Sequence, residues 1–155
     1  MVVAIRLRKC LDEHKVPYQV LRHHRCFTSS EIAQVLHVRG KDLAKVVIVT
    51  ADGKQVMAVL PANFQVNLEA FARAAGAKKA ELATEEEFRE TFTDCEVGAM
   101  PPFGNLYGLP TWVDTTLTAD DRIVFEAGTH EEAVKVAYAD FARIVKPKVA
   151  DFSLR

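Results

Sequence analysis

The segment AKVVIVTADGKQVMAVL, residues 44–60, contains the clearest structural signal in the chain. Two apolar runs rich in β-branched residues, Lys45–Thr50 and Gln55–Leu60, flank the pair Asp52-Gly53. Asp-Gly is a preferred pair in two-residue hairpin turns, because such turns need a positive φ at both central positions. The segment therefore predicts a β-hairpin.

Helical and strand patterns are interspersed on both sides of this hairpin. The expected helices cover residues 2–15, 28–38, 67–75, 84–92 and 129–145, and the further strands cover residues 18–21, 111–114, 122–126 and 148–152. Three of these helices open with a capping box, at Thr28, Thr84 and Thr129. Because the hairpin breaks a strict βαβ alternation, we expect an α/β (mixed α+β) fold in which helices wrap a mixed β-sheet.

Length and composition are typical of one soluble globular domain over residues 1–155, with 49% hydrophobic and 26% charged residues. Apolar runs such as Val46–Val49 are far shorter than the roughly 20 residues that a membrane-spanning helix needs. Residues 2–15 carry charged side chains, among them Arg6, Arg8, Lys9, Asp12 and Glu13, and do not resemble a secretory signal. We therefore expect a cytoplasmic protein with no membrane segment.

Charge is spread unevenly over the chain. Residues 1–50 hold nine Lys/Arg against four Asp/Glu, a net of +5, whereas residues 51–100 hold five against nine, a net of −4. A basic third on a nearly neutral chain is not typical of a tight nucleic-acid binder. It suits a protein that contacts a few phosphates and releases them, although chance clustering of charges explains it equally well.

The cysteines and histidines do not form a metal or disulfide pattern. Cys10, Cys26 and Cys95 are odd in number and far apart, and the adjacent His23 and His24 would point to opposite sides of a strand. The chain also contains neither a Walker-type phosphate loop nor a dinucleotide-binding glycine motif. We therefore expect no metal and no cofactor.

The residues left to carry chemistry begin with Lys45 and the loop Gly98–Gly104. Lys45 starts an otherwise apolar strand, where its charge costs free energy unless it reaches an anion or the surface. In the loop, Gly98 permits close approach of a ligand, and Pro101-Pro102 stiffens the turn so that neighbouring N–H groups stay aimed. Fixed backbone donors are what an oxyanion hole requires, although a purely structural turn has the same sequence.

Two further polar residues are candidates. His130 lies just inside the start of the expected helix 129–145, where the helix dipole favours a neutral imidazole and thus a hydrogen-bonding or base role. A lone histidine at such a place is more often a surface residue at a helix start. Asp114 ends an expected strand and is compatible with a turn former.

Together these residues resemble the YbaK/prolyl-tRNA-synthetase-associated family of aminoacyl-tRNA deacylases. The resemblance covers nearly the whole chain through the order and spacing of six segments. These are Val16-Pro17-Tyr18, Phe27–Ala33, Ala44–Val49, Val59–Ala62, the G-x-x-x-P loop Gly98–Pro102, and Val124–His130. The resemblance implies a mixed-sheet, partly barrel-like α/β fold. It also implies hydrolysis of the ester that joins a mischarged amino acid to the 3′ end of a tRNA.

The resemblance implies catalytic roles for five residues. Lys45 matches the lysine that holds the phosphate region of the terminal adenosine. Gly98 and Pro102 match the loop whose backbone positions the scissile carbonyl. Asp114 and His130 fall near the remaining polar positions of the family's site.

For substrate binding, we expect a pocket shaped by Phe27, Met100 and Phe103, with Ala99 and Val46 beside them. Size exclusion in such a pocket would keep out the larger cognate amino acids. Many family members carry a small polar residue after the lysine, whereas this chain has Val46, so the water-positioning or substrate-selecting contact of that position differs here and the identity of the amino acid stays open.

An aminoacyl ester is already activated, so the enzyme needs alignment and carbonyl polarisation more than a strong nucleophile. We expect a water, or a group on the substrate itself, to attack. The expected substrate is tRNA(Pro) carrying Ala, Cys, Ser or Thr, and an aminoacyl-tRNA synthetase is a possible partner.

Two alternatives stay open. The same cleft could belong to a non-catalytic module that binds an aminoacyl-adenosine end. A thiol-dependent hydrolase could instead use Cys26 or Cys95 as its nucleophile.

Overall fold

The computed structural model describes residues 4–25, 29–96 and 98–154. The helices are α1 Ile5–Glu13, α2 Ser29–Val35, α3 Leu68–Ala75, α4 Glu85–Phe88 and α5 Tyr138–Val145, with short 3-10 helices at Gly104–Leu106 and Thr115–Ala119. The strands are β1 Gln19–Arg22, β2 Ala44–Ala51, β3 Lys54–Pro61, β4 Gln65–Val66, β5 Ala80–Leu82, β6 Thr111–Asp114, β7 Arg122–Thr129, β8 Glu132–Ala137, β9 Lys148–Ala150 and β10 Ser153–Leu154.

The predicted hairpin is confirmed as β2–β3. Its strands pair in antiparallel register from Ala44 opposite Pro61 to Ala51 opposite Lys54. Asp52 and Gly53 both have a positive φ, of 48° and 82°, as a two-residue turn requires. The Asp52 carboxylate also accepts hydrogen bonds from the N–H groups of Lys78 and Lys79, which fixes the chain after α3 against the turn.

Three sheets are built around this hairpin. The largest has the order β5-β2-β3-β6-β9, in which β6 is parallel to both β3 and β9 and the other pairs are antiparallel. The second is antiparallel with the order β1-β8-β7, and the third pairs β10 with β4. A parallel bridge between Leu43 and Val124 joins the first sheet to the second. The expected mixed sheet is confirmed.

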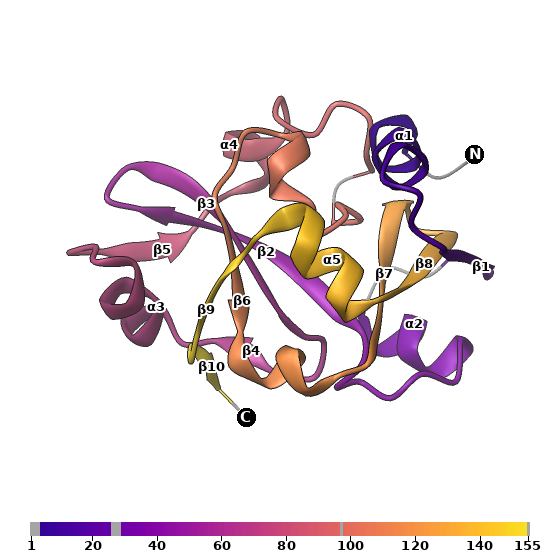
Figure 1. The fold of residues 1–155 in the computed structure, drawn as a ribbon. Coiled ribbons are helices and arrows are strands. Elements are labelled where there is room, and N and C mark those ends of the chain that lie inside the picture. Colours follow the sequence, from indigo (N-terminus) through magenta and orange to yellow (C-terminus); the bar gives the residue numbers. More distant parts are fainter. Residues whose placement is uncertain (1–3, 26–28, 97, 155) are drawn as a thin grey trace.

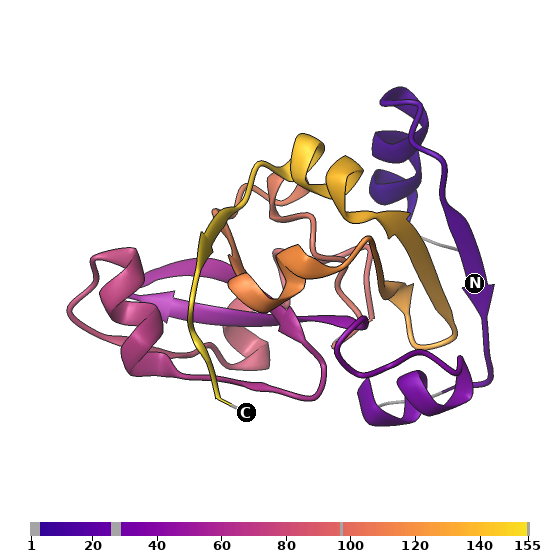
Figure 2. The same ribbon diagram turned by 60° about the horizontal axis from the view of Figure 1, so that its bottom comes forward.

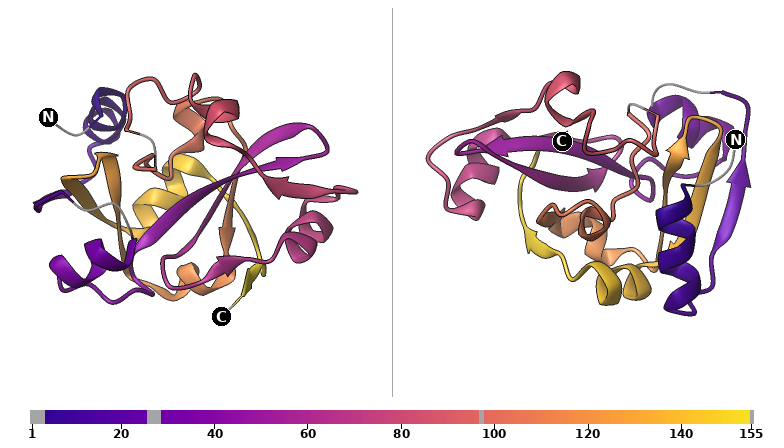
Figure 3. Two further views of the ribbon diagram at one scale, coloured as in Figure 1. Left: turned by 180° about the vertical axis from the view of Figure 1, so that it is seen from behind. Right: turned by 90° about the horizontal axis from the view of Figure 1, so that it is seen from above.

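Helices cover the sheets on several sides. In Figure 1 the β2–β3 hairpin crosses the molecule, and α5 lies over its middle. Figure 2 places α1 and α2 at the two ends of the β1-β8-β7 sheet. Both views of Figure 3 place α3 at the end of the molecule opposite α1. The site described below lies between these ends, near the bridge from β2 to β7.

The core is divided by the large sheet. The main cluster packs one face of β2 and β3 against α1, β7, β8 and α5, with Phe103, Phe125 and Phe141 in ring contact at its centre. A second cluster on the opposite face packs Phe71 of α3 against Trp112 and Phe152. A third, smaller cluster lies under α2. Full burial of each such ring stabilises the fold by about 2–3 kcal/mol.

Several predicted helix ends are confirmed. Asn67 caps α3 by accepting from the N–H of Ala70, and Gly76 ends it in the left-handed conformation. Thr84 and Glu87 form the predicted capping box of α4. The predicted capping box at Thr28 lies outside the described residues.

The helix predicted over residues 129–145 is wrong in its first half. Residues 132–137 form strand β8, which pairs with β7 across a two-residue turn, and α5 begins only at Tyr138. Thr129 and Glu132 are opposite each other in this hairpin, so their spacing imitates a capping box without a helix. The alternating β-branched residues Val134 and Val136 are the pattern that favours the strand.

Candidate active site

The candidate site begins at a gap along one edge of β2. Strand β5 pairs with β2 only at residues 49–51, and β7 pairs with the segment before β2 through the Leu43–Val124 bridge. Between these points, residues 45–47 pair with β3 on one side, and no described strand pairs with them on the other. The sheet is therefore open at this place.

The backbone of Val46 faces this gap. The carbonyl of Asp42 accepts from the N–H of Val124 at 3.0 Å, and the carbonyl of Ile48 accepts from the N–H of Ala83 at 2.9 Å. Alternate residues of a strand direct their backbone groups to the same edge. Val46 lies four residues after Asp42 and two residues before Ile48, both even separations, and thus directs its N–H and its carbonyl into the opening.

A small cavity of about 80 Å³ lies in this opening. We call it the cleft; it is lined by Leu43, Ala44, Lys45, Val46, Gly98, Met100 and Glu126. A shallower apolar depression of about 230 Å³ continues from it and shares Val46, Gly98 and Met100. The structure thus brings together four of the residues predicted for the site: Lys45, Val46, Gly98 and Met100.

Lys45 enters the cleft as a partly desolvated cation. It is half-buried, and burial lowers the pKa of its ammonium group. Within the described part of the chain no carboxylate forms an ion pair with it. An ammonium group in such a place is suited to an anionic ligand that restores its lost solvation.

The loop that starts at Gly98 forms the opposite wall. Gly98 has a φ of +86°, and a Cβ atom there would lie 3.5 Å from Cε1 of His130. The loop is fixed to β7, because the N–H of Glu96 donates to Gly128 at 2.7 Å and the N–H of Gly128 donates to Ala99 at 2.8 Å. The N–H groups of Gly98 and Met100 donate to no described residue. They are the free backbone donors beside the cleft.

The other predicted loop residues do not line the cleft. Ala99 has no exposed surface, and its N–H donates to Glu96 at 3.0 Å. Pro102 is buried within the loop. Phe103, predicted to shape the pocket, lies instead in the main core between Phe125 and Phe141. Phe27 and Cys26 lie outside the described residues.

His130 reaches the site from the turn between β7 and β8, not from a helix, so the helix-dipole argument for it is wrong. Its side chain is 7% exposed and lies under Gly98. Its Nδ1 is 3.7 Å from Oε2 of Glu126, and its Nε2 is 4.0 Å from Oε2 of Glu96. Its backbone N–H donates to Glu96 at 3.1 Å. The His130 ring thus lies between the carboxyl groups of Glu126 and Glu96, beneath the loop.

Glu126 was missed by the sequence analysis. It projects from β7 into the cleft wall with 12% of its side chain exposed. Burial, with a smaller effect from Glu96, raises the pKa of its carboxyl group to about 8. The sequence signal was a single glutamate among the apolar residues of Val124–Ala127. Burying its carboxyl group costs free energy unless a partner or a ligand hydrogen-bonds it.

An ion-pair clamp closes one side of the site. Arg25 donates to both oxygens of Glu96, at 3.2 and 2.8 Å, and to Glu131 at 3.2 Å. It connects the segment after β1 to the loop before Gly98 and to the β7–β8 turn. Bidentate Arg–carboxylate pairs of this kind add geometric precision more than net stability.

Asp114 lies away from these residues and does structural work. It is 1% exposed and accepts hydrogen bonds from the N–H of Phe152 at 2.8 Å and from the hydroxyl of Ser153 at 3.1 Å. It also caps the 3-10 helix that follows, through the N–H and the hydroxyl of Thr116. Burial opposes its ionisation, but these hydrogen bonds outweigh burial and lower its pKa.

The described cysteines are poor nucleophiles. Burial raises the pKa of the Cys95 thiol to about 12, and its Sγ lies 3.3 Å from the hydroxyl of Tyr107. Burial also raises the pKa of Cys10 in α1. Neither residue lines the cleft. Because the thiolate is the reactive form, Cys95 cannot serve a thiol mechanism near neutral pH.

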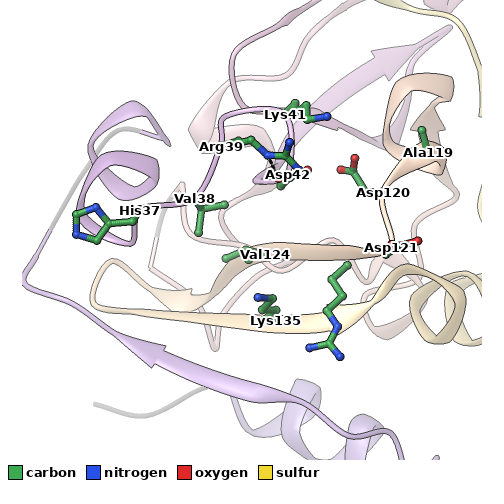
Figure 4. Close-up of a pocket in the computed structure, with 11 residues that line it drawn as sticks. His37, Val38, Arg39, Lys41, Asp42, Ala119, Asp120, Asp121, Val124 and Lys135 are labelled. Carbon is green, nitrogen blue, oxygen red and sulfur yellow. Dashed lines mark hydrogen bonds and ion pairs between the residues drawn. The ribbon is translucent and has the colours of Figure 1, made fainter.

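A larger pocket of about 490 Å³ includes Asp42 and Val124, which adjoin the Leu43–Val124 bridge at the end of the cleft (Figure 4). It is lined by His37, Val38, Arg39, Lys41, Asp42, Ala119, Asp120, Asp121, Arg122, Val124 and Lys135. Arg39 pairs with Asp42 at 2.7 Å, whereas Lys41, Arg122 and Lys135 form no ion pair with a described residue. We call these three residues the basic rim.

Over residues 4–25, 29–96 and 98–154, no three His, Cys, Asp or Glu side chains come together as a metal site would need. In the same part of the chain, every helix is too short or too polar to cross a bilayer.

Comparison with known proteins identifies the family. The model of the aminoacyl-tRNA editing domain matches residues 23–144. A multifunctional Ser/Thr-tRNA deacylase, ProXp-y of Escherichia coli K12, is 31% identical over 155 residues, which cover 95% of this chain and 90% of that protein. The corresponding protein of Escherichia coli O157:H7 matches equally well.

Solved structures share the fold. The hypothetical protein APE2540 superposes with a TM-score of 0.86 at 20% identity, covering 96% of this chain and 99% of the other. A candidate trans-editing enzyme for prolyl tRNA synthetase gives a TM-score of 0.83 at 20% identity, covering 98% and 97%. With the family model and the deacylase relative, the conclusion is direct: this chain belongs to the aminoacyl-tRNA editing domain family and is an aminoacyl-tRNA deacylase, a hydrolase of the aminoacyl ester bond.

Proposed function

We propose that the chain acts as a single trans-editing domain in the cytoplasm and removes a small non-cognate amino acid, such as Ala, Cys, Ser or Thr, from tRNA(Pro). The observation that carries this proposal is the meeting of Lys45, Gly98 and Met100 around one cavity of about 80 Å³. Such a cavity has the volume of two to three waters, at about 30 Å³ each, and thus suits a small side chain. The named substrates of the E. coli relative, Ser and Thr, fall in this size class.

In this proposal Lys45 binds the phosphate region of the terminal adenosine. Lys45 is half-buried and without an ion pair in the described structure. A bound anion would therefore replace part of the solvation that its ammonium group has lost. The N–H groups of Gly98 and Met100 donate to the ester carbonyl oxygen and stabilise the negative charge that develops on it. Fixed donors of this kind lower the barrier without reorganising during the reaction.

The attacking group in this scheme is a water or a hydroxyl of the substrate. The described residues place no serine or cysteine in the cleft. His130, under Gly98, holds the loop and the β7–β8 turn together and so keeps the N–H donors in place. The backbone of Val46 offers one further donor and one acceptor to the bound end of the tRNA.

The basic rim, Lys41, Arg122 and Lys135, supplies the contact to the tRNA backbone. Strand β7 runs from Arg122 at the rim to Glu126 at the cleft, a path of about 13 Å at about 3.3 Å per residue. Phosphates adjacent to the bound 3′ end therefore lie within reach of the rim. Three cations give a modest electrostatic term, which suits rapid release.

Two alternatives from the sequence are less well supported. Family membership among deacylases argues against a non-catalytic binding module. The raised pKa of Cys95 and its position away from the cleft argue against Cys95 as a nucleophile. Because one structural relative is described as working with prolyl tRNA synthetase, that enzyme is the first protein partner to test.

The test is deacylation of tRNA(Pro) charged with Ala, Cys, Ser, Thr or Pro, by the wild type and by Lys45→Ala. Lys54→Ala, an exposed lysine at the far end of the same hairpin, is the matched control. We expect loss of one or more small amino acids but not of Pro, a fall of at least about 100-fold in kcat/KM for Lys45→Ala, and no change for the control. Full activity of a folded Lys45→Ala variant would refute the role of Lys45.

A further inference from the structure

The cleft contains one acidic side chain, Glu126, whose position calls for a function. Its carboxyl group lies in the wall of the cavity with Lys45, Val46, Gly98 and Met100. Apart from Lys45, the other side chains that line this cavity are apolar or absent. A substrate side chain that enters the cavity therefore meets a single carboxyl group among apolar surfaces.

The carboxyl group is not used up by protein contacts in the described structure. Its Oε2 atom is buried and has no hydrogen-bond partner among the described residues. Nδ1 of His130 lies 3.7 Å from this oxygen, which is beyond hydrogen-bond distance. The side chain keeps 12% of its surface exposed and lines the cavity, so a ligand there can hydrogen-bond the carboxyl group through its exposed part and recover some of the about 1–3 kcal/mol that an unsatisfied buried polar group costs.

The protonation state favours a neutral partner. Burial and the neighbouring Glu96 keep the pKa of Glu126 near 8, so at neutral pH the group is mostly a carboxylic acid with one donor and one acceptor. A hydroxyl group matches both. A cationic α-ammonium is a poorer match, because Lys45 lines the same small cavity and repels it.

We propose that Glu126 is a specificity-determining residue that hydrogen-bonds the side-chain hydroxyl of the amino acid to be removed, and so selects seryl and threonyl esters over alanyl esters. This inference rests on the proposed function, because it assumes that the cleft takes the aminoacyl group. A site built to bind a hydroxyl discriminates strongly against an analogue that lacks it, since its own polar group is then left unpaired.

The test compares Ser, Thr and Ala esters on one tRNA species, with kcat/KM measured for each. Glu126→Leu removes both hydrogen-bonding atoms at similar size, and Glu126→Gln retains a donor and an acceptor. Glu69→Gln is the control, because Glu69 is an exposed glutamate on α3 that does not line the cleft. Folding is checked by circular dichroism and by the unfolding midpoint.

We expect Glu126→Leu to lower kcat/KM for the Ser and Thr esters by at least about tenfold and for the Ala ester by less than about threefold. Glu126→Gln should restore part of the Ser-to-Ala ratio that Glu126→Leu loses, and Glu69→Gln should leave the wild-type ratio unchanged. If Glu126→Leu does not fold, the ratio of kcat/KM for the Ser ester to that for the Ala ester in Glu126→Gln decides instead. The inference would be overturned if the wild type and Glu126→Gln both hydrolyse the Ser ester no faster than the Ala ester.

An equal loss for all three esters would also overturn it, because Glu126 would then contact a part that every aminoacyl-tRNA shares. Failure of the proposed function looks different. In that case the wild type itself hydrolyses none of the small aminoacyl esters, and no ratio can be measured.

Discussion

Replacing Glu126 with Gln should make the protein more stable at alkaline pH, and the size of the effect follows from the structure. In the unfolded chain a glutamate ionises near 4.5, whereas in the folded protein burial and Glu96 keep its pKa near 8. The folded state therefore holds a proton that the unfolded state has lost between these two values. The stability contributed by this proton is fully present below pH 4.5 and is lost as the pH rises through 8.

The magnitude comes from the difference between the two pKa values. At about 1.4 kcal/mol for each tenfold change in proton affinity, the full linkage between 4.5 and 8 is about 5 kcal/mol. Relaxation of the side chain and entry of water absorb part of this energy. We expect the wild type to lose at least about 2 kcal/mol relative to Glu126→Gln as the pH rises from 5 to 9.

The assay is urea unfolding of the wild type, Glu126→Gln and Glu131→Gln at pH 5, 6, 7, 8 and 9. Contributions from other groups, such as Asp120 with its pKa raised to about 6, cancel because all three proteins share them. The free energies of unfolding of wild type and Glu126→Gln should diverge steadily with pH, whereas Glu131→Gln should run parallel to the wild type. Parallel curves for wild type and Glu126→Gln would refute the reasoning.

Three other variants test the remaining assignments. Gly98 has a φ of +86°, so Gly98→Ala should lower the free energy of unfolding by about 1–2 kcal/mol and kcat/KM for deacylation by at least about tenfold. Unchanged kinetics would exclude the loop from the site. Arg122→Ala and Lys135→Ala should each raise KM and reduce the slope of log KM against log salt concentration by about one. An unchanged slope would show that the basic rim does not contact the tRNA backbone. Asp114→Ala should lower the free energy of unfolding by about 3 kcal/mol, because Asp114 accepts hydrogen bonds from Phe152 and Ser153 of the C-terminal segment, and the folded fraction should keep its kcat. A stable variant with a lowered kcat would instead indicate a catalytic role.

Local signals in the sequence predicted the elements that depend on local chemistry. The Asp52-Gly53 turn, the Asn67 cap and the Thr84–Glu87 capping box each satisfy backbone groups within a few residues, and all three are confirmed. Thr129 and Glu132 have the same spacing as a capping box, but here the spacing belongs to a hairpin. A cap and a two-residue turn cannot be told apart by spacing alone when tertiary pairing with β1 decides the outcome.

The candidate site could be predicted only in part. Lys45 and Gly98 have unusual local sequences, a cation in an apolar strand and a glycine before two prolines, and both lie in the cleft. Glu126 and the Arg25–Glu96 pair acquire their meaning from contacts between distant segments, which no local pattern encodes. Phe103 looked like a pocket residue because of its neighbours, but a ring between Phe125 and Phe141 is more favourable in the core.

The gap beside β2 also has a consequence for self-association. An unpaired strand edge can template the addition of a strand from another molecule, and proteins protect such edges with charges and prolines. Here the edge at residues 45–47 carries the charge of Lys45 and is flanked by the polar carboxyl group of Glu126 and by a loop that contains Pro101-Pro102. The side chains that serve the substrate therefore also act as gatekeepers against aggregation, and variants that replace both Lys45 and Glu126 by apolar residues should be judged for colloidal behaviour as well as for turnover.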